Sequence, residues 1–362
     1  MKKNLCKLPI FSMLLGLIVF LAACSTDDNA TTTEGTSKDK LTVAIPFVLG
    51  APNGAPMWLG EGLGFFEEEG LDVEVIALPG KPSEIFGLVV AGKADVAISQ
   101  PDTLVYPIAE GNDQGLEWVF TPYQAPIFGI FVEESSGIKS AKDLAGKKVG
   151  MGSLGAPFET FMRANVKADG GDAESVEAVA ISSGSAAMEA LKKGEIDAFV
   201  GNQGDIAIAQ LATATEGRLL EFPNAVAEGF AAGFVMREDT DEAKRDVIAR
   251  YIRAVIKSAI VAQENPEHAI EVNWEMYPAS KPVENVEKAL EEAKVSLNVS
   301  VSNYKKADNG QWGYINKERW EKFVANNGFT DKIPDVTILY DYSLLDKIND
   351  FDEEAVREKA KE

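Results

Sequence analysis

Short apolar runs alternate with longer amphipathic segments through the first part of the chain. The apolar runs at residues 41–47, 71–77 and 96–99 have the length of buried strands. The segments between them, at 56–68 and from Pro82 onward, have helical spacing. Strands that alternate with helices favour parallel pairing through right-handed crossovers. We therefore expect an α/β fold with parallel-rich sheets and helices on both faces.

The segment at residues 92–99 returns about a hundred positions later as residues 194–201. Each copy is typical of a helix stopped by glycine, an Asp in a tight turn and a short apolar strand. The elements expected before the second copy follow the same order as those before the first. They are strands at 148–152 and 176–181 and helices at 157–168 and from Ser185. The repeat predicts two similar α/β lobes.

Two extended apolar segments, punctuated by glycine, alanine or proline, are suited to cross between the lobes, at residues 120–132 and 229–236. Two crossings make the first lobe discontinuous, with residues 41–130 and 232–362, and leave 131–231 for the second lobe. Ligands of such sheets bind beyond the carboxyl ends of the strands, so two facing lobes share one ligand cleft. The glycines at the crossings let the lobes hinge, or they are ordinary strand ends.

The N-terminus has the pattern of an export signal. Three lysines precede an apolar run at residues 10–21 that is short for a membrane span. The Leu-Ala-Ala-Cys sequence ending at Cys24 resembles a bacterial lipobox, which implies removal of residues 1–23 and lipidation of Cys24, for example with palmitate. The alternative is an ordinary signal peptide or a hydrophobic anchor with an incidental Cys. Residues 24–40 predict a disordered tether, so we expect a protein that lipid anchors to the cell membrane on its extracytoplasmic face.

Composition argues against several kinds of chemistry. Cys6 leaves with the signal and Cys24 carries lipid, so the folded part has no thiol for a disulfide, a metal site or a nucleophile. The formal net charge of −22 becomes −25 without the three signal lysines, which opposes nucleic-acid binding. His268 is the single histidine, and the carboxylates have no metal-ligand spacing. We expect no enzyme activity, no metal, no cofactor and no nucleic-acid partner.

Several segments together resemble the NMT1/THI5-like solute-binding proteins. Residues 58–73 are similar to the first helix and second strand of that family, 92–95 to its next turn, and 138–150 to the entry into its second lobe. The ending at 349–352 is also common there. The resemblance implies a type II, two-lobe periplasmic-binding-protein-like fold. It also implies a receptor for an ABC importer of the nitrate, sulfonate, taurine or pyrimidine-precursor type, with a small-molecule ligand, a permease and its ATPase as partners. We expect a monomer. The fungal enzymes of the family use clusters of His and Cys that this chain lacks.

The candidate ligand groups lie in loops after the predicted strands, where helix N-termini also converge. They are Phe47, Asn53, Gly54, Ala55, Gln100 and Tyr123 in the first part of the chain, and Ser153, Gly155, Ala156, Phe158, Asn202 and Gln203 in the second. We interpret Gln100 and Gln203 as the preferred hydrogen-bonding pair. Helix capping is the alternative, and it suits Asp102 and Asp205 better. Asn53 could instead be a turn residue, the small residues before Phe158 could form a tight turn, and the aromatic residues could pack in the core.

The expected ligand loops contain no Lys, Arg or His, and only Lys81 lies close to them in the sequence. Because a dianion is expected to meet a bidentate arginine, this pattern favours a neutral or zwitterionic nitrogen heterocycle such as a pyrimidine precursor. The pyrimidine-precursor branch of the family typically has Asp-Trp-x-Pro-Asn and a His in the first loop, of which this chain keeps only Pro52 and Asn53. The alternatives are a small anion held by helix N-termini, such as an alkanesulfonate, taurine or nitrate, and an exported enzyme or an adhesin of the same fold.

Overall fold

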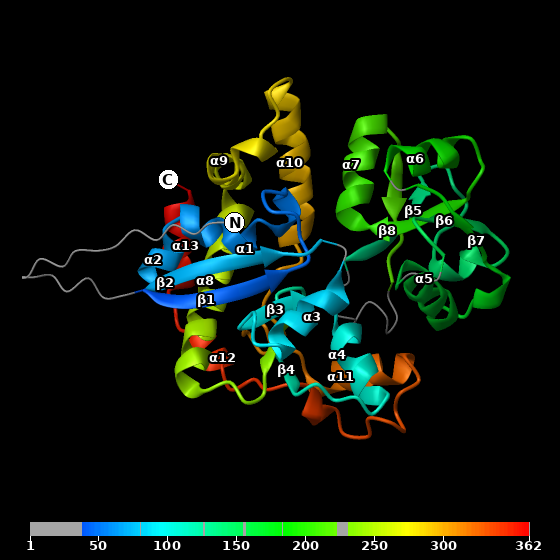
Figure 1. Cartoon of the computed structure of the whole chain (residues 1–362). Coiled ribbons are helices and arrows are strands. Elements are labelled where there is room, and N and C mark those ends of the chain that lie inside the picture. The colour runs from blue at the N-terminus through cyan, green and yellow to red at the C-terminus, as the bar shows by residue number, and fades with distance from the viewer. Residues whose placement is uncertain are drawn as a thin grey trace, which may run out of the picture. The chain divides into compact units, whose positions relative to one another are not determined.

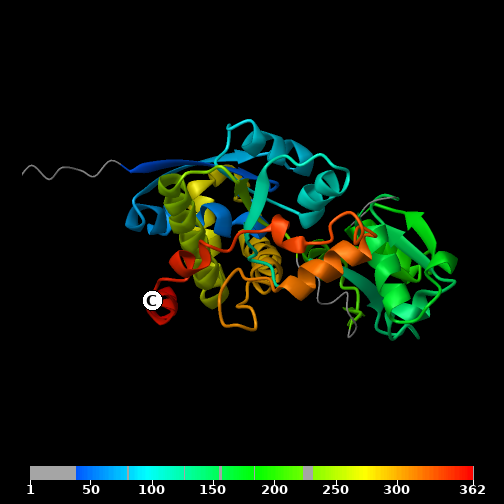
Figure 2. The same ribbon diagram turned by 90° about the horizontal axis from the view of Figure 1, so that it is seen from below.

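The computed structural model describes residues 38–79, 81–125, 127–154, 157–182, 184–222 and 231–361. The predicted signal peptide, Cys24 and nearly all of the predicted tether lie outside the described residues. The described chain contains two five-stranded sheets with helices on both faces (Figures 1 and 2). This is the α/β arrangement that the repeat predicts.

The first sheet has the strand order β2-β1-β3-β10-β4. Its strands are β1 (Asp39–Ile45), β2 (Leu71–Ala77), β3 (Val96–Ser99), β4 (Leu116–Phe120) and β10 (Gly233–Arg237). Strands β2, β1 and β3 are parallel, whereas β10 is antiparallel to both of its neighbours. The chain therefore leaves this sheet after β4 and returns to it through β10.

The second sheet has the strand order β7-β6-β8-β5-β9. Its strands are β5 (Phe128–Glu133), β6 (Lys148–Met151), β7 (Glu177–Ala180), β8 (Ala198–Asn202) and β9 (Gly217–Leu219), drawn in green in Figure 1. Strands β7, β6 and β8 are parallel, and β5 is antiparallel to β8 and β9. Each sheet is thus mixed, with a parallel trio that comes from one copy of the repeat.

Successive residues of a strand point to opposite faces of its sheet, and both faces of the first sheet are covered. Val43 and Phe234 pack toward one set of helices, whereas Ala44 and Val235 pack toward the other. The first set is α1 (Pro56–Gly62), α8 (Glu242–Glu264) and α9 (Pro266–Met276), and the second is α3 (Pro82–Val90), α4 (Pro101–Ala109) and α11 (Lys317–Asn326). In the second sheet, α5 (Pro157–Ala168) covers one face, and α6 (Ser185–Lys192) and α7 (Gln203–Thr213) cover the other.

The remaining described elements are short, apart from one long helix late in the chain. They are α2 (Phe65–Glu68), α10 (Val286–Val301), α12 (Leu345–Ile348), α13 (Glu353–Ala360), and the 3-10 helices η1 (Pro52–Gly54), η2 (Ala141–Leu144), η3 (Ala173–Ser175), η4 (Pro278–Ser280) and η5 (Val336–Leu339). Within the described ranges, no helix is both long enough and apolar enough to cross a membrane.

The expected elements agree closely with the structure, with one helix as an exception. Strand β2 and helix α5 have the bounds that the pattern predicts. The prediction of a single helix at residues 56–68 is wrong, because the structure has two helices there, α1 and α2. Gly64 lies between them with a φ of +79°, in the left-handed region that favours glycine.

The repeated Asp turn makes the same backbone contacts in both lobes. The Asp95 N–H donates to the Thr42 carbonyl (2.8 Å), and Asp95 Oδ2 accepts from the Thr42 N–H (2.8 Å). Asp197 makes the same pair of bonds with Lys148, at 2.8 and 2.9 Å. Each Asp therefore ties the third strand of its parallel trio to the first strand, which gives the Gly-x-x-Asp repeat a structural reason.

Candidate functional site

The predicted ligand loops follow strands that end at a common edge of each sheet. Strands β1 and β3 are parallel neighbours, as are β6 and β8, so the loops after them leave each pair from the same edge. At the edge of the first sheet lie Phe47, Asn53, Gly54, Ala55 and Gln100. At the edge of the second lie Ser153, which is exposed, and Phe158, Asn202 and Gln203. Gly155 and Ala156 lie outside the described residues.

The loop after β1 presents only part of its candidate residues to solvent. A Cβ atom on Gly54 would lie 2.7 Å from Cβ of the half-buried Phe47, so this close approach requires glycine. Ala55 is fully buried in the core. The Asn53 side chain is exposed, and its backbone carbonyl accepts a hydrogen bond from Ser300 Oγ (2.7 Å). Of the candidate residues in this loop, the exposed Asn53 and the half-buried Phe47 are therefore the ones that a ligand can reach.

Gln100 holds the N-cap position of α4 in extended backbone, but its side chain does not cap the helix. The side chain is half-buried, and its amide makes no hydrogen bond to another residue in the described part of the chain. Asp102 lies in the first turn of the same helix, and burial raises the pKa of its carboxyl, against the backbone N–H groups of Asp102 and Thr103. The edge of the first sheet thus offers an amide that is available for a ligand, beside a carboxylate.

Asn202 and Gln203 use their amides within the second lobe. Asn202 Oδ1 accepts from the Gly204 N–H (2.9 Å) and so caps α7. Gln203 Nε2 donates to the Phe128 carbonyl (3.0 Å), which fixes the side chain against the first residue of β5. The two glutamines of the predicted hydrogen-bonding pair therefore differ in their bonding.

Tyr123 packs in the core of the first lobe. Its side chain is 3% exposed, and its ring meets that of Tyr304 edge to face with 4.8 Å between centroids. The Tyr304 hydroxyl donates to the Tyr123 hydroxyl at 3.5 Å. Burial raises the pKa of Tyr123, and hydrogen bonds from Tyr304 and Ser300 oppose that rise. The side chain thus holds the chain segment that leaves β4.

Half-buried aromatic rings gather at the ligand edge of the second sheet. The Phe158 ring meets that of Phe128 edge to face, with 4.9 Å between centroids. The centroid of the Phe161 ring lies 5.8 Å from that of Phe128 and 5.4 Å from that of Phe222. Of these rings, sequence reasoning selected only Phe158. Phe128 could have been found as well, because it lies in the predicted crossing at the start of an apolar strand.

An arginine from α11 reaches the predicted crossing. Arg319 Nη1 donates to Gln124 Oε1 (2.8 Å), and Nη2 donates to the Gln124 carbonyl (2.9 Å). Sequence reasoning missed this cation near the expected loops. No local pattern could have indicated it, because 195 positions separate the two residues.

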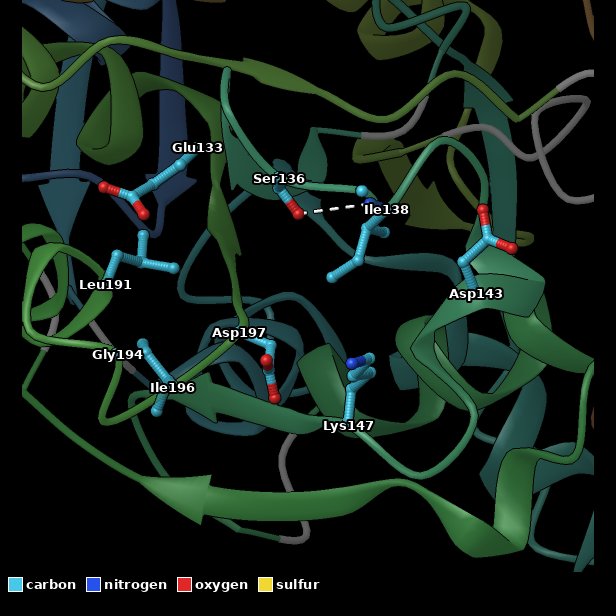
Figure 3. A pocket seen from close by; sticks show the side chains of 10 residues that line it. Glu133, Ser136, Ile138, Asp143, Lys147, Leu191, Gly194, Ile196 and Asp197 are labelled. Carbon is cyan, nitrogen blue, oxygen red and sulfur yellow. Dashed lines mark hydrogen bonds between the residues drawn. The ribbon is translucent and has the colours of Figure 1, made fainter.

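A hollow of about 510 Å³ lies at the opposite edge of the second sheet, before β6 and β8 (Figure 3). Two of the carboxylates that line it, those of Asp143 and Asp197, already accept hydrogen bonds from the backbone. Asp197 Oδ2 accepts from the Lys148 N–H, and Asp143 Oδ2 accepts from two N–H groups of its own turn. Ser136 Oγ accepts from the Ile138 N–H, which is the dashed line in Figure 3. These groups stabilise turns, so this hollow is a weaker candidate for the ligand than the loop edges.

A second hollow, of about 580 Å³, lies between residues 48–52 and 276–280 and so borders the first ligand loop. The Tyr277 ring, which lines it, meets the Trp58 ring edge to face at 5.8 Å between centroids. In the part of the chain that the structure covers, no group of three or more His, Cys, Asp or Glu side chains could hold a metal ion.

Two lobes with parallel trios, and loops that meet at the carboxyl ends of the strands, define the periplasmic-binding-protein class. The family model described as NMT1/THI5 like matches residues 51–269, and the chain belongs to this family. This result confirms the resemblance found in the sequence.

Known relatives and structures agree with this class. The chain is 26% identical over 324 residues to the formylaminopyrimidine-binding protein of Halalkalibacterium halodurans, a match that covers 87% of this chain and 92% of that protein. The 4-amino-5-hydroxymethyl-2-methylpyrimidine phosphate synthase of Schizosaccharomyces pombe is 25% identical over 100 residues, which is 27% of this chain and 28% of the synthase. The periplasmic aliphatic sulphonate binding protein of Escherichia coli superposes with a TM-score of 0.57 at 15% identity, and the match covers 86% of this chain and 92% of that structure. This last likeness concerns the fold alone.

Proposed function

We propose that the protein is an extracytoplasmic solute receptor that captures a small organic ligand between its two lobes by hinge closure and delivers it to an ABC importer. The ligand of this proposal is a neutral or zwitterionic nitrogen heterocycle such as a pyrimidine precursor. The proposal is carried by the groups at the two loop edges. The amide of Gln100, which has no hydrogen-bond partner among the described residues, lies in one lobe, and the Phe128 and Phe158 rings lie in the other.

These groups suit a flat, polar heterocycle. A primary amide donates and accepts in one plane, as the edge of an aminopyrimidine requires, and aromatic rings bind flat rings by stacking or edge-to-face contact. The relative that matches along 92% of its own length is named for binding a formylaminopyrimidine, which supports the same ligand class.

A receptor for a small anion is the second candidate. The aliphatic sulphonate binding protein has the same fold, and Arg319 supplies a cation near the crossing. Two of its donors already bind Gln124, however. An anion would therefore rely on helix N-termini, which contribute less than a bidentate arginine pair.

Receptor function without catalysis is part of the proposal. The similarity to the pyrimidine phosphate synthase spans about a quarter of the chain, whereas the similarity to a binding protein spans 87% of it. His268 donates its backbone N–H to Asn265 Oδ1 near the start of α9, far in the sequence from every candidate ligand loop. Incubation of bound ligand with the protein should return the ligand unchanged, and recovery of a converted product would show an enzyme.

The proposed setting is the extracytoplasmic face of the cell membrane, with the monomeric receptor lipidated at Cys24 and a permease with its ATPase as partners. The lipobox-like sequence before Cys24 supports this setting. Cys24→Ala should release the protein from membranes or leave it as an uncleaved precursor. Processing and retention like those of the parent would count against lipidation.

The ligand class is tested by calorimetric titration with a panel of compounds. We expect 4-amino-5-hydroxymethyl-2-methylpyrimidine or its formylamino analogue to bind, with an affinity that changes little between low and high salt, because no cation–anion pair is being screened. Taurine, nitrate and an alkanesulfonate should not bind at micromolar concentrations. Tight binding of one of these anions, with the pyrimidines inactive, would replace the proposal by the anion receptor.

A further inference from the structure

The end of α10 contacts the first ligand loop, the segment that leaves β4, and helix α7 of the second lobe. Ser300 Oγ donates to the Asn53 carbonyl (2.7 Å) in the loop after β1. The Asn303 carbonyl accepts from the Gln124 N–H (3.0 Å) in the segment that leaves β4. Residues 299–304 therefore hold both the first ligand loop and the start of the crossing.

The same segment faces the second lobe. Helix α10 packs against α7, whose first turn follows the candidate residue Asn202. Cγ1 of Val299 lies 3.9 Å from the position that a Cβ atom on Gly204 would take. One helical turn of the C-terminal region thus contacts the candidate loops of both lobes.

The segment is itself held firmly in the first lobe. Gln263 Nε2 of α8 donates to the Val301 carbonyl (2.7 Å) and to the Tyr304 carbonyl (2.9 Å). The side chains of Val301 and Tyr304 are 2% and 1% exposed. A buried anchor of this kind fixes the position of Ser300, which is half-buried at the surface of the segment.

A second hydrogen bond from the C-terminal half holds the other end of the same loop. Asn273 is fully buried on α9, and its Nδ2 donates to the Gly50 carbonyl (2.8 Å). Its Oδ1 accepts from Trp58 Nε1 (2.7 Å), which fixes the orientation of the amide. The loop from Gly50 to Asn53 is therefore held at both ends by helices that lie more than two hundred positions later in the sequence.

We infer that Ser300 is a positioning residue for the ligand site, and that it sets the place of the first ligand loop through the Asn53 carbonyl. This inference rests on the proposed function, because it assigns Asn53 and its loop to the ligand. The segment at residues 299–304 keeps this loop in a fixed position relative to the crossing and to the start of α7. Ligand binding in the first loop and closure of the second lobe are then linked through one rigid turn.

The chain offers a conservative variant and a matched control for the test. Ser300→Ala removes the hydroxyl, and Ser300→Thr keeps it. Ser302 lies on the same turn and is exposed, and among the described residues its Oγ donates to the Val299 carbonyl alone (2.9 Å). Ser302→Ala therefore removes a comparable hydroxyl that does not touch the ligand loop.

Two measurements on the full chain decide the inference. Amide hydrogen exchange of residues 48–55, without any ligand, should be faster in Ser300→Ala than in the parent, and parent-like in Ser300→Thr and Ser302→Ala. Titration with 4-amino-5-hydroxymethyl-2-methylpyrimidine should give an affinity about three- to tenfold weaker for Ser300→Ala alone, with an almost unchanged melting temperature.

Parent-like exchange and affinity in Ser300→Ala, or an equal effect of Ser302→Ala, would overturn the inference. If the parent binds no compound of the panel, the proposed function fails. The exchange measurement then still decides whether Ser300 positions the loop.

Discussion

At the scale of single residues, Gln100 and Gln203, the predicted hydrogen-bonding pair, have different roles in the structure. Both follow the third parallel strand of their lobe. The amide of Gln100 is unengaged among the described residues, whereas Gln203 Nε2 is bonded to the Phe128 carbonyl. We therefore expect Gln100→Ala to weaken pyrimidine binding about tenfold with little change in melting temperature. Gln203→Ala should weaken binding and also lower the melting temperature, because a bond between α7 and β5 is lost.

Titration and thermal unfolding of both variants check this difference. Gln210→Ala is a suitable control, because Gln210 also lies on α7 and donates to a backbone carbonyl, at Gly217, in the edge strand β9. A Gln100→Ala variant that binds the pyrimidine as the parent does would remove Gln100 from the site.

Glu117 on β4 gives the stability of the first lobe a pH dependence. Burial raises the pKa of its carboxyl to about 7, against the nearby Arg245, while Asp341 and Glu238 add to the rise. A carboxyl whose pKa is higher in the folded state contributes stability that is fully present below the unfolded pKa of about 4.5 and is lost as the pH rises toward 7. The free energy of unfolding of the parent should therefore fall between pH 5 and about 7, relative to that of Glu117→Gln.

Denaturant unfolding of both proteins at several pH values measures this difference. Glu117→Gln removes the titrating group and keeps the shape of the side chain. A difference between parent and variant that stays constant from pH 5 to 8 would mean that Glu117 is ionised throughout, as the partner of Arg245.

At the scale of elements, local patterns were sufficient where a contact lies within one lobe and close in sequence. The repeat predicted both parallel trios, and the apolar spacing predicted β2 and α5 with their bounds. The burial of Tyr123 against Tyr304 could not be predicted, because 181 positions separate the two rings. The same holds for the bond between Ser300 and Asn53, which spans 247 positions. Spacing along a chain reports which face of an element is apolar, and does not report which distant element will cover it.

The Asp turns give a prediction at this scale. Asp95→Ala and Asp197→Ala each remove a carboxylate that binds a backbone N–H of the neighbouring strand, at Thr42 or at Lys148, so each should destabilise its own lobe. A hydrogen bond to a charged group contributes about 1.5–3 kcal/mol to the free energy of unfolding. The loss should be larger for Asp95, because this residue is half-buried and its Oδ1 also lies 3.2 Å from Lys244 Nζ. Asp197 is exposed, so solvent replaces part of its contribution.

Hydrogen exchange resolved by segment checks this assignment. Asp95→Ala should speed exchange in β1 and β3, and Asp197→Ala in β6 and β8. Asp113→Ala, which removes a bond within a single exposed turn, is the control and should leave both sheets unchanged. Faster exchange in the wrong sheet, or in neither, would contradict the role given to the repeat.

At the scale of the whole molecule, the chain crosses twice between the two sheets. Each crossing is followed by a strand that pairs antiparallel with a member of a parallel trio. Strand β5 begins the second sheet at Phe128, next to the end of β8, and β10 returns to the first sheet at Gly233, next to the end of β3. Strands β5 and β10 therefore both begin at the edges where the candidate ligand groups lie. A ligand that contacts both edges favours the closed arrangement by its difference in affinity for the two states.

Capture of a neutral heterocycle by closure of the lobes is tested by small-angle X-ray scattering of the protein. The radius of gyration is measured without ligand and with saturating 4-amino-5-hydroxymethyl-2-methylpyrimidine. The parent and Gln100→Ala are also compared at one subsaturating concentration of the pyrimidine, where the variant is the control. The radius of gyration should be smaller for the liganded parent, and the variant should respond more weakly to the pyrimidine. A radius that stays the same while calorimetry shows the pyrimidine to be tightly bound would contradict closure of the lobes.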